Sequence, residues 1–350
     1  MPPGSFESEV LTQPQSFADM LAAYAGPDSP LGRLDPVLKK AGATRSVMFL
    51  GMGSSLFASI PAQYMLALRG LPAWSVDASE YMYYRLDDPA TFLPVLTSQS
   101  GESAEIKRLA EDWRGRVPYI AVTNTPDSTL GRGAAAILPI LGGTEKSTTS
   151  KTYTNTLAIV TALAARVAGM DVAEALKAYA GLPAAMTALL DGWRSHLGVF
   201  ADFLGDAGHI DLIGRGPSLA TVGQGGLIFR ELAHVKTAPL NTGLFRHGLI
   251  PSMKSGGSMI AFAPAGVTDT LTLGLVDEVV EMGGKVILVT NREVEPGPRK
   301  LVFRLPAPDG AYELHMPVLE IILIELLGIL LAERRGLEPG AGIAKITAKE

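Results

Sequence analysis

The stretch Ser46-Val-Met-Phe-Leu-Gly-Met-Gly-Ser-Ser55 is an apolar run that ends in Gly-x-Gly and two serines, and a helical pattern follows it. The same order of residue types returns at Ile210-Asp-Leu-Ile-Gly-Arg-Gly-Pro-Ser218. Further on, Tyr119-Ile-Ala-Val-Thr-Asn124 is matched by Val286-Ile-Leu-Val-Thr-Asn291. The first glycines of the two Gly-x-Gly motifs are 163 residues apart, and the two asparagines are 167 apart. An ordered series at a nearly fixed offset indicates a tandem duplication.

Each copy alternates short apolar runs with longer helical patterns, which predicts a parallel sheet in each half. Residues 47–50 and 120–122 are apolar throughout, as in strands that are buried on both faces. The connections between the runs are long enough for crossover helices, so we expect two tandem doubly wound α/β domains. Residues 171–205 show helical spacing and are predicted to connect the two copies.

These patterns predict three segments along the chain. A leading segment, residues 1–35, would pack as a helix with Phe17, Met20 and Leu21 inward and has no evident chemistry. Residues 36–195 would form the first domain with its connecting helices. Residues 196–350 would form the second domain.

The composition describes a well-buried globular protein, because 47% of the 350 residues are hydrophobic and 19% are charged. The net charge of −5 gives no general attraction to nucleic acid or to acidic membranes. The absence of cysteine excludes disulfides, thiolate ligands and a cysteine nucleophile, and the scattered histidines do not suggest a metal site. Neither a signal peptide nor an apolar span of membrane length is evident, so we expect a cytoplasmic protein.

A loop rich in hydroxyls, Ser98-Gln-Ser-Gly-Glu-Ser103, follows another apolar run. Its three serines offer O–H donors, and Gly101 lets the backbone approach a ligand closely. Residues 104–113 have helical spacing, so the loop would lie at a helix N-terminus, where N–H groups and the helix dipole favour phosphate. The alternative is a polar turn without a ligand, and this segment alone leaves both readings open.

Ser54 and Ser55 follow the first predicted strand and would add hydroxyls to the same anion site, because ligands of open α/β sheets bind beyond the carboxyl ends of the strands. A dinucleotide site would need a third glycine where Leu56 stands, so Gly-x-Gly alone is weak evidence for NAD. We therefore predict no cofactor.

A third polar cluster, Gly143-Thr-Glu-Lys-Ser-Thr-Thr-Ser-Lys-Thr-Tyr153, precedes an apolar helix predicted for residues 156–168. Its hydroxyls and two lysines at a helix start would suit a sugar phosphate. A capped and solvated helix terminus is the alternative interpretation.

Together these motifs resemble the SIS (sugar isomerase) domain family in its tandem form, which implies two flavodoxin-like α/β sandwiches. The likeness is to the isomerase half of glucosamine-6-phosphate synthase and to the related sugar-phosphate deaminases, from about residue 45 to the C-terminus. It is carried by Gly53-Ser-Ser55, Ala78-Ser-Glu-Tyr81, Ser98-Gln-Ser-Gly-Glu-Ser103, Gly143-Thr-Glu145 with Ser150-Lys151, Phe229-Arg-Glu-Leu232, Arg246-His-Gly248 and Ile343-Ala-Lys345.

The resemblance implies a role for each motif. Glu231 would move a proton between C1 and C2 of the open-chain sugar, His247 would open and close the pyranose ring across a dimer interface, and Lys345 would reach the sugar carbonyl. Phosphate binding is implied for Ser55, Ser98, Gln99, Ser100 and Ser103, and sugar binding for Gly53, Ser54, Thr148, Ser150 and Lys151.

The chemistry of the three catalytic candidates agrees with these roles. A carboxylate can serve two adjacent carbons, an imidazole titrates near neutral pH, and a lysine can carry imine chemistry. On the residues alone, Glu231 could also be a surface partner of Arg230, His247 a loop residue, and Lys345 part of a polar tail. The other histidines are interpreted as structural: His196, His209, His234 and His315.

The second copy lacks the serine loop. At the matching place it has Ala261-Phe-Ala-Pro-Ala-Gly-Val-Thr268, in which Pro264 has no N–H to donate. We expect one phosphate site per chain, with catalytic groups from the second domain. The loop at 143–151 is one residue shorter than in the synthase. Leu244 replaces an acidic residue and Lys236 a histidine, which leaves the identity of the sugar open.

The synthase takes ammonia from a glutaminase domain with a cysteine nucleophile, and this sequence contains neither. The same chemistry in reverse would release ammonia. We therefore expect a homodimeric enzyme that converts glucosamine 6-phosphate, or a close hexosamine phosphate, to fructose 6-phosphate and ammonia. The alternatives are a sugar-phosphate isomerase, a ketoamine-6-phosphate deglycase, or a non-catalytic phosphosugar sensor, the last weakened by the lack of a basic helix-turn-helix segment.

Overall fold

Two parallel sheets, each of five strands within the described residues, form the frame of the protein and confirm the predicted pair of doubly wound α/β domains. The computed structural model describes residues 4–41, 46–84, 88–146 and 148–340. The described residues divide into two compact units. The first unit lies within Gln15–Glu145 and Thr149–Ala180, and the second lies within Met1–Pro14, Lys146–Thr148 and Gly181–Ile343. The predicted domain boundaries at residues 36 and 196 stay a prediction.

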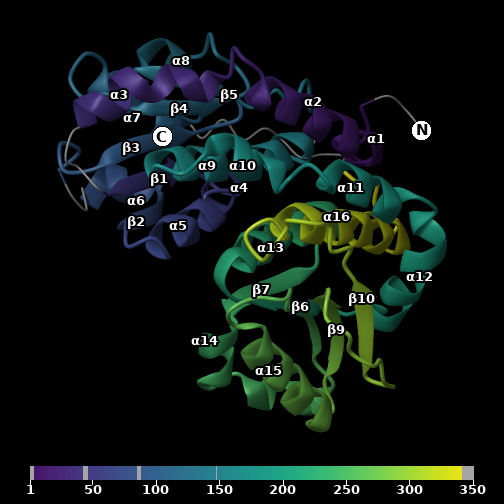
Figure 1. Cartoon of the computed structure of the whole chain (residues 1–350). Helices are drawn as coiled ribbons and strands as arrows, with labels where there is room; N and C mark the ends of the chain where they lie inside the picture. Colours follow the sequence, from purple (N-terminus) through teal and green to yellow (C-terminus); the bar gives the residue numbers. More distant parts are fainter. Residues whose placement is uncertain (1–3, 42–45, 85–87, 147, 341–350) are drawn as a thin grey trace. The chain divides into compact units, whose positions relative to one another are not determined.

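The sheet of the first unit has the strand order β2-β1-β3-β4-β5, with all neighbours parallel (Figure 1). In this register Gly51 of β1 lies beside Asp77 of β2 and Thr97 of β3. β1 and β3 are buried along their whole length, as expected of a parallel sheet that is covered on both faces. The strands are β1 (Val47–Gly51), β2 (Ala73–Asp77), β3 (Leu93–Thr97), β4 (Ile120–Thr123) and β5 (Ala136–Pro139).

The helices agree with the predicted helical patterns in part, because the leading segment, predicted as one helix, contains Phe6–Leu11, Gln13–Ala25 and Pro30–Leu34 as separate helices. α7 spans the predicted residues, and it packs Ile106, Leu109 and Trp113 into a core with Leu50 and Leu96 of the strands. Phe17 and Met20 of α2 are buried as predicted, whereas Leu21 is only partly buried. The helices are α2 (Gln13–Ala25), η1 (Pro30–Leu34), α3 (Asp35–Ala41), α4 (Ser54–Phe57), α5 (Ile60–Ala67), α6 (Ala78–Tyr84), α7 (Ala104–Trp113), α8 (Thr129–Gly133), α9 (Lys151–Val167) and α10 (Val172–Lys177).

The sheet of the second unit repeats this topology, with the order β7-β6-β8-β9-β10. α13 and α16 cover one face, and α14 and α15 cover the other (Figure 1). Its strands are β6 (His209–Gly214), β7 (Lys236–Asn241), β8 (Ser258–Phe262), β9 (Lys285–Thr290) and β10 (Lys300–Arg304). Its helices are α1 (Phe6–Leu11), α11 (Leu182–Leu190), α12 (Trp193–Leu204), η2 (Gly216–Ser218), α13 (Leu219–Ala233), α14 (Thr242–Arg246), η3 (Ile250–Ser255), α15 (Asp269–Glu281) and α16 (Pro317–Arg334). None of the described helices is long and apolar enough to cross a membrane.

The strand order reverses between β1 and β3 in the first unit, and between β6 and β8 in the second. We call these places the first and the second switch point. In open α/β sheets, ligands bind outside the carboxyl ends of the strands at such a point. The topology therefore predicts that a ligand would bind at the loops after β1 and β3, or at those after β6 and β8.

Candidate functional site

The serine loop follows β3 at the first switch point and is held together by its own hydroxyls. The buried Ser98 Oγ accepts a hydrogen bond from the Gly101 N–H at 3.1 Å and lies 2.9 Å from Ser103 Oγ. The Glu102 N–H donates to Ser100 Oγ at 3.2 Å. Ser103 is the residue before α7, so the loop lies at a helix N-terminus as predicted. This arrangement can accept an anion.

Gly101 and Glu102 fix this loop against the start of α8. Gly101 has φ +67°, and a Cβ there would lie 1.9 Å from Ser128 Oγ, so only glycine fits. The Glu102 carboxylate accepts the Thr129 N–H at 2.6 Å and the Thr129 hydroxyl at 3.0 Å, and the backbone N–H is the main cause that lowers the pKa of Glu102. Sequence reasoning missed both contacts. The N-cap pair Ser128-Thr129 is the signal that could have pointed to them.

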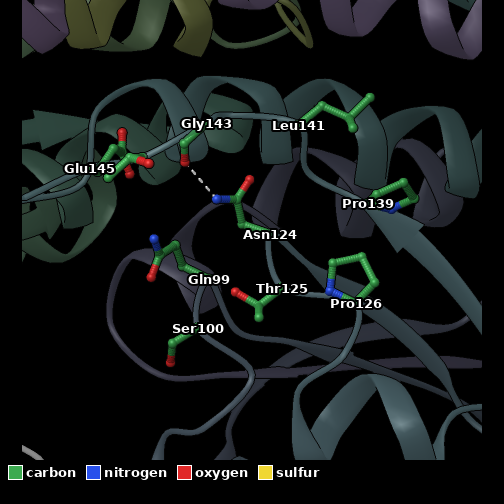
Figure 2. A pocket seen from close by; sticks show the side chains of 10 residues that line it. Gln99, Ser100, Asn124, Thr125, Pro126, Pro139, Leu141, Gly143 and Glu145 are labelled. Atoms are coloured by element: carbon green, nitrogen blue, oxygen red, sulfur yellow. Dashed lines mark hydrogen bonds between the residues drawn. The ribbon is translucent and has the colours of Figure 1, made fainter.

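An open pocket of about 710 Å³ lies at the carboxyl ends of β3, β4 and β5 (Figure 2). Gln99 and Ser100, two predicted phosphate ligands, line it, as does Asn124 after β4. The Asn124 amide donates to Gly143 O at 2.7 Å and accepts from the Gly142 N–H at 2.9 Å. Asn124 therefore shapes the wall of the pocket. The repeat in the sequence matches Asn124 with Asn291, but the sequence did not predict a role for Asn124 at the site.

The polar cluster at 143–153 is organised by a carboxylate. Glu145 is buried and accepts hydrogen bonds from the backbone N–H groups of Ser150 and Thr152, each at 3.0 Å, and from both hydroxyls. These bonds explain why α9 begins at Lys151, five residues before the predicted start. Lys151 Nζ donates to Thr144 O at 3.2 Å.

Several predicted sugar ligands thus already have polar partners in the protein. Ser150 is fully buried against Glu145. Ser54 Oγ, after β1, accepts from the Thr149 hydroxyl at 2.9 Å. Gly53 has φ +50°, which lets the chain turn into α4, and Ser55 is partly exposed. The sugar-binding and phosphate-binding roles of these residues stay predictions.

Glu231 lies near the C-terminal end of α13, where it is partly buried. Burial raises the pKa of its carboxyl. The Thr148 hydroxyl donates to Glu231 Oε2. The neighbouring Arg230 donates to Thr237 O at 2.7 Å and to its hydroxyl at 3.1 Å, so it is engaged there. Glu231 is therefore a partly buried carboxyl that has both a raised pKa and a hydroxyl partner.

Of the other two catalytic candidates, the structure describes only His247. His247 follows α14 as its C-cap and is exposed. Lys345 lies outside the described residues. The joint use of Glu231, His247 and Lys345 in one reaction stays a prediction. Within the described part of the chain, no group of three or more His, Asp or Glu side chains could hold a metal ion.

The second switch point presents carboxylates where the first presents hydroxyls. Glu313 accepts the Val267 N–H at 3.1 Å, and Asp269 accepts Arg292 Nε at 2.6 Å. They border a pocket of about 10 Å³, room for little more than one water. Burial, and then the charge of Asp269, raise the pKa of Glu313. The protein's own carboxylates thus occupy the edge where the first unit has its serine loop.

The fold and these loops define a duplicated α/β protein with a loop rich in hydroxyls at the switch point of one copy. The chain belongs to the SIS domain family, which it matches over residues 43–166 and 203–326. This match confirms the resemblance to the tandem SIS proteins that the motifs indicated.

Similar proteins include the glutamine–fructose-6-phosphate aminotransferases [isomerizing] of Zymomonas mobilis, 28% identical over 94% of this chain and 56% of that protein, and of Methanothermobacter thermautotrophicus, 26% identical over 95% of this chain and 55% of that protein. The chain spans about half the length of these relatives. The C-terminal domain of glucosamine-fructose-6-phosphate aminotransferase from Francisella tularensis has the same fold, with a TM-score of 0.84, 22% identity, and coverage of 97% of this chain and 98% of that one.

Proposed function

We propose that this chain is a phosphosugar enzyme that converts glucosamine 6-phosphate, or a close hexosamine phosphate, into fructose 6-phosphate and ammonia. The observation that carries the proposal is Glu231, a carboxyl whose pKa burial raises and which Thr148 holds by a hydrogen bond. The relatives are named for fructose 6-phosphate and for isomerisation. The sequence has no cysteine, so the proposal uses no cysteine nucleophile.

In the proposed reaction the serine loop binds the phosphate and His247 opens the sugar ring. Glu231 then removes the proton from C2 of the open-chain amino sugar and returns a proton to C1, which leaves an imine at C2. Water adds to this imine, and the C–N bond breaks to give the ketose and ammonia. A base with a raised pKa suits proton transfer near neutral pH. Lys345 is proposed to reach the carbonyl at C1.

An assay of the purified protein for both ammonia and fructose 6-phosphate tests the proposal. Glucosamine 6-phosphate, its C4 epimer and its N-acetylated form are the first substrates to compare. Release of the two products in equal amounts supports the deaminase. Interconversion of ketose and aldose phosphates without ammonia would instead support a sugar-phosphate isomerase, and tight binding without turnover would support a sensor.

Glu231→Gln should separate catalysis from binding. Loss of the base should lower kcat by about 10²–10⁴-fold, the range typical of general acid–base catalysis. The affinity for glucosamine 6-phosphate, measured by calorimetry, should stay within a few-fold of the wild type. The exposed Glu281 at the end of α15 provides a matched control, since Glu281→Gln should change neither quantity. Full turnover by Glu231→Gln would refute its role as the base.

We also propose a homodimer in which His247 acts on the substrate of the partner subunit. Its exposure at the end of α14 supports this, since the side chain is free to meet a second copy. Mixing inactive His247→Ala and Glu231→Gln subunits should then restore part of the activity, because some mixed dimers contain one intact site. Mixtures that stay as inactive as their parents, although subunits exchange, would contradict shared sites.

A further inference from the structure

The N-terminal helix α1 carries a buried carboxylate, although the residue pattern assigns no chemistry to this segment. Glu9 is only 4% exposed, and its Oε1 accepts the Lys146 N–H at 2.8 Å. Gly4, just before α1, leaves room for the Lys146 side chain, since a Cβ added there would lie 2.9 Å from Lys146 Cδ. The contact that holds Lys146 is therefore the hydrogen bond from its backbone N–H to Glu9.

α1 is itself firmly anchored within the second unit. Gln13, two residues after α1 and the first residue of α2, donates from Nε2 to Glu325 Oε2 of α16 at 2.5 Å, and both residues are fully buried. Arg194 of α12 bonds Glu7 of α1 at 2.8 Å and Glu333 of α16 at 2.9 Å. Glu9 is therefore a fixed acceptor rather than a mobile surface group.

The residue held in this way is two positions from a ligand of the proposed base. Thr148 is buried and donates to Glu231 Oε2. A carboxylate that must serve two adjacent carbons depends on its orientation, and a hydroxyl bound to one oxygen sets that orientation. The hydroxyl can do so only if the backbone that carries it is held in place.

We propose that Glu9 is a positioning residue, which fixes the Lys146 N–H so that the Thr148 hydroxyl orients Glu231. This inference rests on the proposed role of Glu231 as the base. Glu9 touches no reacting atom in this proposal. It acts through Lys146 and Thr148, and it gives the N-terminal helix a part in the reaction.

Three variants of α1 test the proposal in the full-length protein with glucosamine 6-phosphate as the substrate. Glu9→Ala removes the acceptor and should lower kcat about tenfold while KM changes less than twofold. It should also move the acid limb of the kcat profile to higher pH, because a displaced hydroxyl no longer favours the charged form of Glu231. Glu9→Gln keeps an acceptor oxygen and should stay near the wild type. Glu7→Gln removes a charge from α1 but keeps an oxygen that accepts from Arg194, so α1 stays anchored and neither kcat nor the acid limb should change.

Amide hydrogen exchange supplies a readout that does not depend on turnover. Exchange at Lys146 should accelerate in Glu9→Ala and stay slow in Glu9→Gln. The proposal is overturned if folded Glu9→Ala keeps the wild-type kcat and acid limb, or if Glu9→Gln is as impaired as Glu9→Ala. If Glu9→Ala does not fold, Thr148→Val must show the same loss of kcat and the same shift, and a normal profile overturns the proposal. Full turnover by Glu231→Gln would instead refute the proposed function, so the two failures are distinguishable.

Discussion

The first and the second switch point share one strand order but present opposite chemistry. At the first, Ser98 and Ser103 place hydroxyls around a glycine with positive φ. At the second, Asp269 and Glu313 fill the edge, and Pro264 lacks an N–H. A phosphate at the second edge would meet the Asp269 and Glu313 carboxylates in a pocket with room for little more than one water. The strand order therefore determines where a ligand site can form, and the residues of the loops determine whether that site can bind an anion.

The two edges also differ in what lies beneath them. At the second, Ser218 Oγ donates at 2.7 Å to Glu320 of α16, a carboxyl that is fully buried. At the first, Ser54 after β1 instead accepts a hydrogen bond from another hydroxyl, that of Thr149, at 2.9 Å. The second switch point is thus coupled to the titration of a buried acid. The pH dependence of stability should report on it.

The largest effect we expect concerns Glu320. Burial raises its pKa from 4.5 to about 7, although the hydroxyls of Thr221 and Ser218 oppose the shift. Between these two pH values the native state holds a proton that the unfolded chain releases. The free energy of unfolding should therefore fall as the pH rises through this window, by roughly 3 kcal/mol in total for this group.

Glu320→Gln should remove this contribution, since the amide stays neutral. Urea unfolding of both proteins at pH 5 and pH 8 measures the difference. The wild type should lose more stability than Glu320→Gln between the two pH values. Equal losses in both proteins would show that Glu320 does not titrate in this window.

The next effect concerns the affinity for the substrate when one glycine at each switch point is replaced by alanine. Gly101→Ala places a Cβ 1.9 Å from Ser128 Oγ at a φ of +67°, and the left-handed conformation alone adds about 1–2 kcal/mol. Binding of glucosamine 6-phosphate, measured by calorimetry, should weaken about 100-fold. Gly266→Ala instead meets the flexible Glu313 carboxylate at 1.9 Å, and the affinity should stay unchanged. Equal affinities of the two variants would mean that the serine loop does not bind the phosphate.

Local patterns in the sequence predicted the frame of this protein well. The apolar runs before Gly51 and Gly214 are strands, and α7 has the predicted bounds, because burial and helical spacing are properties of neighbouring residues. The contact of Glu102 with Thr129 spans 27 residues, and that of Glu9 with Lys146 spans 137. Such contacts depend on tertiary packing, so a local pattern does not specify both partners. The loops could thus be located from the sequence, but the residues that hold them could not.

The smallest effect we expect comes from replacing one serine at each switch point by alanine. Ser98→Ala removes the acceptor of the buried Gly101 N–H, and an unpaired buried donor is unfavourable by about 1–3 kcal/mol. The affinity for glucosamine 6-phosphate should fall about tenfold, because the loop loses the bond that closes it. Ser218→Ala removes a donor to Glu320, so it should lower the free energy of unfolding above pH 7 and leave the affinity unchanged. Calorimetry and urea unfolding on the same two variants distinguish these outcomes. A loss of affinity in Ser218→Ala as large as in Ser98→Ala would place a ligand at both switch points, contrary to the difference in charge between them.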